Sequence, residues 1–196
     1  MITKNILLVG VGGQGTILAA KILTIGLMEA GYDVKMSEIH GMSQRGGAVS
    51  SHVRYGKKVY SPVIEKGSAD VLVSFEQMEA LRWLEYLKPE AKAVVNSQII
   101  KPVPVIIGKA EYSGKILDEI CSKVDATVLD AHAEALAVGN ARALNLLLVG
   151  AATKIMKLEE INWGGIIAQN VKPAFVDVNQ KAFIRGQELV SGAVPA

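Results

Sequence analysis

Two glycine-bearing segments of this 196-residue sequence carry the residues whose types and spacing could do chemistry. The first is Gly10-Val11-Gly12-Gly13-Gln14-Gly15, which matches G-x-G-x-x-G between a predicted strand and a predicted helix. Glycines let a backbone approach an anion closely, and a helix N-terminus offers unbonded N–H groups and a partial positive charge. The segment predicts a turn that binds a diphosphate-bearing ligand, with a tight turn that binds nothing as the alternative.

The second segment, residues 41–47, reads Gly-Met-Ser-Gln-Arg-Gly-Gly and follows a predicted strand at residues 33–39. Its polar side chains are hydrogen-bond donors, and an arginine fork suits a phosphate or a carboxylate. Because ligands of open α/β sheets bind beyond the carboxyl ends of the strands, we expect the two loops to be neighbours. The candidate binding residues are Gly10, Gly12, Gly13, Gln14, Gly15, Ser43, Gln44, Arg45 and Gly46, and no catalytic residue or metal ligand is assigned.

Glu38 keeps a second interpretation open. It lies about 20 residues beyond the glycine turn, where a dinucleotide-binding domain holds its ribose. A free-standing NAD- or FAD-binding Rossmann-like oxidoreductase is therefore the alternative function. A simple NAD domain does not need the second glycine loop, which argues against that alternative. Arg45 could equally form a structural ion pair with a carboxylate such as Glu38.

The other reactive side chains are assigned structural roles. Cys121 is predicted to be a small core residue on an amphipathic helix. Asp130 is predicted to be the N-cap of a helix, so the group Asp130, His132 and Glu134 is interpreted as a helix start rather than a metal site. An i, i+3 series predicts a solvated helix face with ion pairs, and it comprises Glu76, Glu79, Arg82 and Glu85. The residues that could touch a ligand or a partner, or pack in the core, are His40, His52, Trp83 and Trp163.

Apolar runs that alternate with helical patterns predict an α/β fold with a doubly wound, mostly parallel sheet. The predicted strands beyond residues 33–39 are 6–9, 71–73, 93–95, 105–107 and 127–129. Residues 47–64 break the alternation and predict a β-hairpin, while about 131–196 is mainly helical. Nothing in the sequence marks a linker, so residues 1–196 are expected to form one domain.

Composition narrows the class of protein. Half of the residues are hydrophobic, which excludes disorder, and 21 basic against 19 acidic residues give a net charge of +2, which makes nucleic acid an unnatural partner. No apolar run is long enough to span a membrane and no cleavable signal is seen, so a cytoplasmic location is expected. The apolar surplus predicts a surface buried in a partner, which a homodimer would cover if the chain were isolated.

The single cysteine, Cys121, excludes an internal disulfide and an iron–sulfur cluster ligated by this chain's own cysteines. Any such redox centre must therefore belong to another subunit.

Several segments together resemble a known family. They are GVGGQG at 10–15, EIHGMSQRGGAVSSHVR at 38–54, SPVIEKGSADVLVSFEQMEALR at 61–82, VVN at 94–96 and GNARALNLLLVGA at 139–151. They are similar to the small subunits of indolepyruvate ferredoxin oxidoreductases and, more broadly, to the gamma domain of 2-oxoacid:ferredoxin oxidoreductases. The resemblance covers residues 4 to about 186, and G-M-S-Q-R-G-G is its most specific part.

The resemblance implies a heteromeric enzyme that oxidatively decarboxylates an aryl-pyruvate such as indolepyruvate to an acyl-CoA and reduces ferredoxin. It implies that thiamine diphosphate and the iron–sulfur clusters are held by a large partner subunit. Coenzyme A is then a co-substrate, and the glycine turn and Arg45 are assigned to its anionic groups. A third interpretation, a purely structural subunit that orders the large chain, also stays open.

Overall fold

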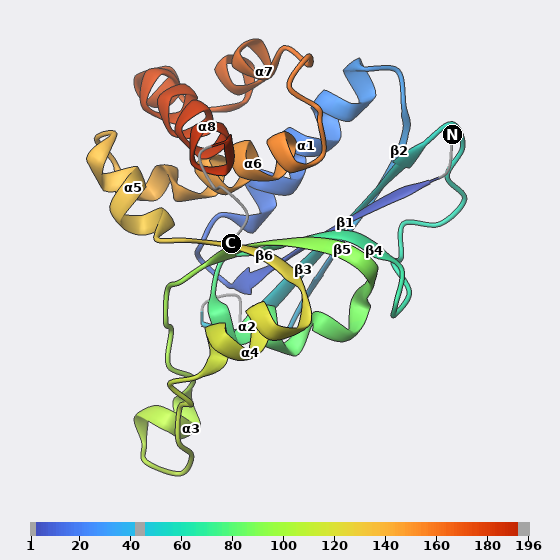
Figure 1. Ribbon diagram of the computed structural model, residues 1–196. Helices are drawn as coiled ribbons and strands as arrows, with labels where there is room; N and C mark the ends of the chain where they lie inside the picture. Colours follow the sequence, from blue (N-terminus) through green and yellow to red (C-terminus); the bar gives the residue numbers. More distant parts are fainter. Residues whose placement is uncertain (1–2, 42–45, 192–196) are drawn as a thin grey trace.

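The computed structural model describes residues 3–41 and 46–191 (Figure 1). The strands are β1 (Lys4–Val11), β2 (Asp33–His40), β3 (Ala48–Gly56), β4 (Ala69–Ser74), β5 (Leu87–Asn96) and β6 (Asp125–Leu129). The α-helices are α1 (Thr16–Glu29), α2 (Gln77–Arg82), α3 (Val103–Ile106), α4 (Ile116–Lys123), α5 (Ala131–Ala137), α6 (Leu144–Ile155), α7 (Trp163–Asn170) and α8 (Val176–Ser191). Short 3₁₀ turns lie at Leu84–Tyr86, Ala141–Ala143 and Pro173–Phe175.

The six strands form one sheet in the order β2-β3-β1-β4-β5-β6. Strands β1, β4, β5 and β6 pair in parallel, whereas β3 is antiparallel to both β1 and β2. Strand β2 therefore runs in the same direction as β1, and the carboxyl ends of the two meet at one edge with the start of β3. This confirms the expected α/β class with a mostly parallel sheet.

Helices cover both faces of the sheet, as Figure 1 shows. Alternate residues of each central strand enter one of two separate cores, as the period of two in a strand requires. In β1, Ile6 and Leu8 pack into the core beneath α1 and α6, whereas Leu7 and Val9 pack into the core beneath α2 and α4. All four of these side chains are fully buried, so β1 is apolar without interruption.

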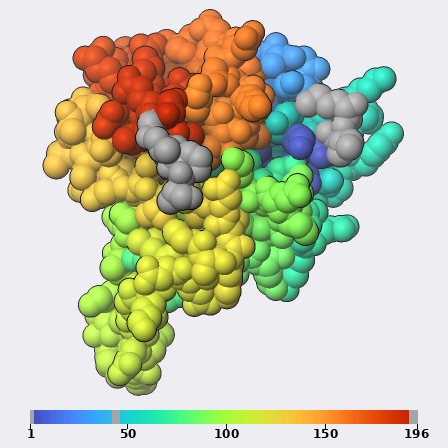
Figure 2. Space-filling view, viewed as in Figure 1, coloured from blue at the N-terminus to red at the C-terminus, as the bar shows by residue number. Residues whose placement is uncertain are grey.

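Two of the predicted β elements are wrong in part or in full: the hairpin within residues 47–64, of which only β3 forms, and the strand at 105–107. The hairpin expected within residues 47–64 does not form, because β3 finds its antiparallel partners in β2 and β1 and residues 57–64 contain no strand. The apolar run at 105–107 is not a strand either: Pro102 and Pro104 open the short helix α3, which projects from the body of the molecule in Figures 1 and 2. Proline favours the first helical turn, where its missing N–H costs nothing.

The region from about residue 131 is mainly helical, as predicted, and α6 and α8 pack against each other. Among the described residues, no helix is long and apolar enough to cross a membrane.

Candidate binding site

The glycine turn lies beside Gly46 and Gly47, the described end of the second glycine-bearing segment. The Gly12 N–H donates to the Gly47 carbonyl oxygen at 2.8 Å, and the Gly46 N–H donates to the Gly12 carbonyl oxygen at 3.3 Å. Both bonds join the turn after β1 to the end of the loop between β2 and β3. The expectation that the two loops are neighbours is therefore confirmed, and its cause is that β1 and β2 end at the same edge of the sheet.

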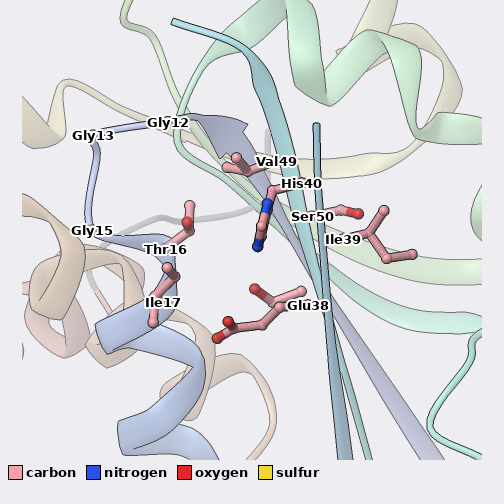
Figure 3. A pocket seen from close by; sticks show the side chains of 11 residues that line it. Gly12, Gly13, Gly15, Thr16, Ile17, Glu38, Ile39, His40, Val49 and Ser50 are labelled. Atoms are coloured by element: carbon pink, nitrogen blue, oxygen red, sulfur yellow. The ribbon is translucent and has the colours of Figure 1, made fainter. Parts of the chain in front are cut away.

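A pocket of about 360 Å³ opens beside this junction (Figure 3). The first turn of α1 forms one wall, and the end of β2 with the start of β3 forms the other. Glu38 pairs with Ser51 and His40 pairs with Val49 across the two strands, so these side chains share one face of the sheet. The full lining is Gly12, Gly13, Gly15, Thr16, Ile17, Glu38, Ile39, His40, Val49, Ser50 and Ser51.

The pocket has a positive wall at the N-terminus of α1 and a carboxylate, Glu38, on the opposite wall. Helix α1 begins after Gly15 with no side-chain cap and no acidic residue in its first turn. Its first N–H groups therefore have no helical carbonyl to bond, and its positive dipole end is not offset by a carboxylate on the helix itself. Glu38, on the opposite wall, is exposed and offers carboxylate oxygens to hydroxyl or amine donors.

Gln14 faces away from the pocket and fixes the turn. Its side-chain oxygen accepts from the Val11 N–H at 2.7 Å, and its side-chain nitrogen donates to the Phe75 carbonyl at 2.8 Å and to Gln98 Oε1 at 3.0 Å. These bonds tie the glycine turn to the ends of β4 and β5. The Gln14 amide is thus already fully engaged inside the protein.

Gly15 is the glycine of the turn that the surroundings demand most strictly. Its φ is +83°, in the left-handed region, and a Cβ there would lie 2.6 Å from Asn145 Nδ2. Asn145 is buried at the start of α6 and donates weakly to the Gly15 carbonyl. Helix α6 therefore sets the position of the α1 N-terminus.

The predicted binding residues lie in different places relative to the pocket. Gly12, Gly13 and Gly15 line the pocket, Gly46 is bonded to Gly12, and Gly10 lies in β1 behind the turn. Ser43, Gln44 and Arg45 lie outside the described residues. The assignment of all nine to ligand binding stays a prediction. Sequence reasoning gave no role to Gln98 or Asn145, although the Asn145 segment was part of the resemblance.

The predicted solvated face of residues 76–85 is correct for Arg82 and Glu85, which are exposed and form ion pairs, and wrong for Glu76 and Glu79. Glu76 is 1% exposed and Glu79 is 6% exposed. Glu76 caps α2 by accepting from the Glu79 N–H at 2.9 Å, and its Oε1 also accepts from Tyr112 Oη at 2.9 Å and from the Ile100 N–H at 3.2 Å. Glu76 thus holds both ends of the segment that projects around α3.

Glu79 pairs with Arg82 at 3.3 Å, as the i, i+3 spacing suggested, but its burial raises the pKa of its carboxyl. Cys121 also differs from expectation: it is exposed on α4 rather than packed in the core, because Ile116 and Ile120 fill the buried side of that helix. The Asp130 cap is confirmed by its bond to the Ala133 N–H at 3.0 Å. Trp163 is a core residue and Trp83 is half-buried.

His52 is buried on β3, on the opposite face of the sheet from the pocket. Its Nδ1 accepts from the Ile64 N–H at 3.0 Å, and its ring packs edge-on against Trp83 and Tyr86. Desolvation, with a smaller contribution from Arg54, holds the pKa of His52 below its usual value. His52 is therefore a neutral structural residue, whereas His40 is exposed in the pocket.

The donor set does not fit a resident cluster or metal. An iron–sulfur cluster needs about four thiolates, and Cys121 is the sole cysteine. Within residues 3–41 and 46–191, no group of three or more histidine, cysteine, aspartate or glutamate side chains is placed to hold a metal ion. The Mg²⁺ that accompanies a diphosphate cofactor would also require oxygen ligands of this kind.

The NAD- or FAD-binding alternative finds no support in the topology. In a dinucleotide-binding domain the second strand lies directly beside the first, so its terminal carboxylate reaches the ribose. Here the antiparallel strand β3 separates β2 from β1. Glu38 faces the first turn of α1 across the width of one extra strand.

Comparison with known proteins agrees with this fold. The family model described as pyruvate ferredoxin/flavodoxin oxidoreductase matches residues 5–189. The chain is 40% identical over 190 residues to the indolepyruvate oxidoreductase subunit IorB of Pyrococcus horikoshii, covering 93% of each chain.

Two solved structures share the fold. One is the gamma subunit of a keto/oxoacid ferredoxin oxidoreductase from Geobacter sulfurreducens, with a TM-score of 0.72, 23% identity and coverage of 97% of this chain and 99% of that one. The other is a 2-oxoglutarate:ferredoxin oxidoreductase from Magnetococcus marinus, with a TM-score of 0.78 and 19% identity; all of this chain matches 32% of that longer chain. The family match spans nearly the whole sequence, and the chain belongs to the pyruvate ferredoxin/flavodoxin oxidoreductase family.

Proposed function

We propose that the chain is the small subunit of an indolepyruvate- or aryl-pyruvate-oxidising, CoA-dependent enzyme, and that it completes the active site of a large partner subunit. The coarser class is that of its family: the chain is a subunit of a heteromeric 2-oxoacid:ferredoxin oxidoreductase. The observation that carries the finer proposal is the 40% identity, over 93% of both chains, to a protein named as an indolepyruvate oxidoreductase subunit.

Thiamine diphosphate and the iron–sulfur clusters belong, in this proposal, to the large subunit. Thiamine diphosphate supplies the carbanion chemistry of decarboxylation there, and ferredoxin takes up the electrons through the complex. The single exposed cysteine supports this division, since this chain has no set of thiolates for a cluster.

This chain's own contribution is proposed to be the binding of coenzyme A at the glycine turn. The 2-oxoglutarate:ferredoxin oxidoreductase with the same fold was solved with coenzyme A and succinyl-CoA bound. In this chain, the uncapped N-terminus of α1 suits an anionic group, and Glu38 suits a hydroxyl or amide donor of the same ligand. The neighbouring residues Ser43, Gln44, Arg45 and Gly46 would complete the ligand contacts.

The remaining parts of the proposal concern assembly and location. Residues 1–196 are proposed to act as one gamma-type domain in the cytoplasm. A homodimer of the isolated chain would cover the surface that the partner covers in the complex.

The experiment that tests the CoA assignment measures the KM for CoA of the reconstituted enzyme carrying Arg45→Ala. We expect the KM for CoA to rise at least about tenfold while the KM for indolepyruvate stays the same, because a charged hydrogen bond is lost at one substrate only. Arg185→Ala is the matched control, since Arg185 bonds to Glu134 at 2.8 Å outside the pocket. An unchanged KM for CoA in Arg45→Ala would sink the assignment.

A further inference from the structure

A second cavity, of about 490 Å³, lies on the helical side of the glycine turn. It is bounded by α1, α6, the end of α7 and the start of α8, and it belongs to no part of the pocket described above. Leu18 and Asn145 line it, and Asn145 contacts Gly15, so the two cavities flank the same first turn of α1.

Both charged side chains that line this second cavity are positive. Arg142 and Lys172 line it, and no carboxylate does. Neither side chain has an ion pair among the described residues, whereas the guanidinium groups of Arg54, Arg82 and Arg185 are each bonded within the protein. Both cations are exposed and available to an anion.

The rest of the lining suits a ring with hydroxyl or amine donors. Phe175 is 46% exposed, so its ring is accessible to a planar ligand. Asn170 and Asn179 use their side-chain nitrogens internally, on the carbonyls of Ile166 and Phe175, which leaves their amide oxygens as acceptors.

We propose that this cavity binds a phosphorylated nucleoside, with its phosphate on Arg142 and Lys172, its base against Phe175 and its donors on the asparagine oxygens. A phosphate alone would bind Arg142 and Lys172 but make no contact with the Phe175 ring. An apolar ligand would leave the charges of Arg142 and Lys172 unpaired. The cavity shares no lining residue with the glycine-turn pocket, and all of its lining residues belong to this chain.

Calorimetric titration of the whole chain with ADP, adenosine and inorganic phosphate tests the proposal. ADP is expected to bind with a Kd below about 1 mM. Arg142→Ala and Lys172→Ala are each expected to weaken ADP about tenfold and to leave adenosine unchanged, since they remove charge-assisted bonds to phosphate. Phe175→Ala is expected to weaken both ADP and adenosine. All three side chains are exposed, so the variants should fold, and Lys57→Ala is the matched loss of an exposed cation elsewhere.

Three results would overturn the proposal. The first is a Kd for ADP above about 1 mM. The second is ADP binding that is unchanged in Arg142→Ala, and the third is ADP binding that is abolished by Ile17→Trp, which fills the glycine-turn pocket. Competition by CoA then identifies the source: displacement of ADP assigns the cavity to the nucleotide end of CoA, and coexistence assigns it to a free nucleotide.

Discussion

Gly12 and Gly47 are joined by a backbone hydrogen bond of 2.8 Å, although they lie on different loops. The bond exists because β1 and β2 run in the same direction and end at the same edge, with β3 antiparallel between them. It brings the turn before the uncapped N-terminus of α1 against Gly46 and Gly47, which precede β3. The candidate site depends on this junction.

The first prediction concerns the left-handed glycine before α1. Gly15→Ala should lower the free energy of unfolding by about 3 kcal/mol, from backbone strain and from the clash with Asn145. Gly31→Ala is the matched control: its φ of +86° is nearly the same as the +83° of Gly15, but its Cβ would meet nothing within 4 Å. We expect about 1 kcal/mol there, from strain alone. Urea denaturation measures both, and equal losses would show that Asn145 does not restrict the turn.

The second prediction concerns the side chain that ties the turn to the sheet. Gln14→Ala removes the Gln14 acceptor of the Val11 N–H and one of the two donors to the Phe75 carbonyl, which keeps Asn96 Nδ2 at 3.0 Å, and should cost about 1–3 kcal/mol of unfolding free energy. Gln169→Ala, on the exposed side of α7, should change the same quantity by less than about 0.5 kcal/mol. Thermal unfolding followed by circular dichroism compares the two. A Gln14 variant as stable as the Gln169 variant would mean that the three bonds contribute nothing.

The third prediction is a pH dependence of stability that comes from His52. Its pKa in the folded protein lies below the unfolded value of about 6.5, so the unfolded state binds the proton first. The free energy of unfolding should therefore fall as the pH is lowered below about 6.5, by at most about 1.4 kcal/mol per pH unit. This part of the pH slope should disappear in His52→Gln.

The exposed residues His40 and His132 provide the controls for this slope. His40→Gln and His132→Gln should each retain the decline in stability between pH 7.5 and 5.5, a window above the ordinary carboxylate range of about 4. If His52→Gln keeps the full slope, another group causes it.

The fourth prediction concerns the projecting segment around α3. Ile106 is 68% exposed there, and Val103 and Ile107 are also more than half exposed, which is the kind of apolar patch that a partner covers. Ile106→Asp should leave the stability of the isolated chain within about 0.5 kcal/mol of wild type and raise the Kd for the large subunit at least about tenfold. Leu136→Asp, 60% exposed on α5 across the sheet, is the matched control. Equal affinities of the two variants would place the interface elsewhere.

Much of the fold could be predicted from the sequence because buried parallel strands have a simple signature. The runs at 6–9, 71–73 and 93–95 are apolar on both faces, and each lies in a central strand covered by helices on both sides. The glycine turn was also predictable, since strand, glycines and helix are consecutive in the sequence.

The errors have local causes. Residues 105–107 are as apolar as a strand, but two prolines start a helix that no sheet covers. The hydrophobic periodicity of β3 indicates a strand but not which strands it pairs with, so its place between β2 and β1 could not be predicted. Glu76 was predicted to be exposed, but it is buried. Its burial depends on hydrogen bonds from Tyr112 and Ile100, which are distant in the sequence, so the local pattern does not reveal it.

The central claim is that this chain completes the active site of a larger oxidoreductase subunit. The measurement that tests it most directly is the CoA- and indolepyruvate-dependent reduction of ferredoxin by the large subunit, titrated with this chain. We predict negligible CoA-dependent activity for the large subunit alone, and activity that rises until one small subunit is present for each large one. Full CoA-dependent activity of the large subunit without this chain would contradict the claim.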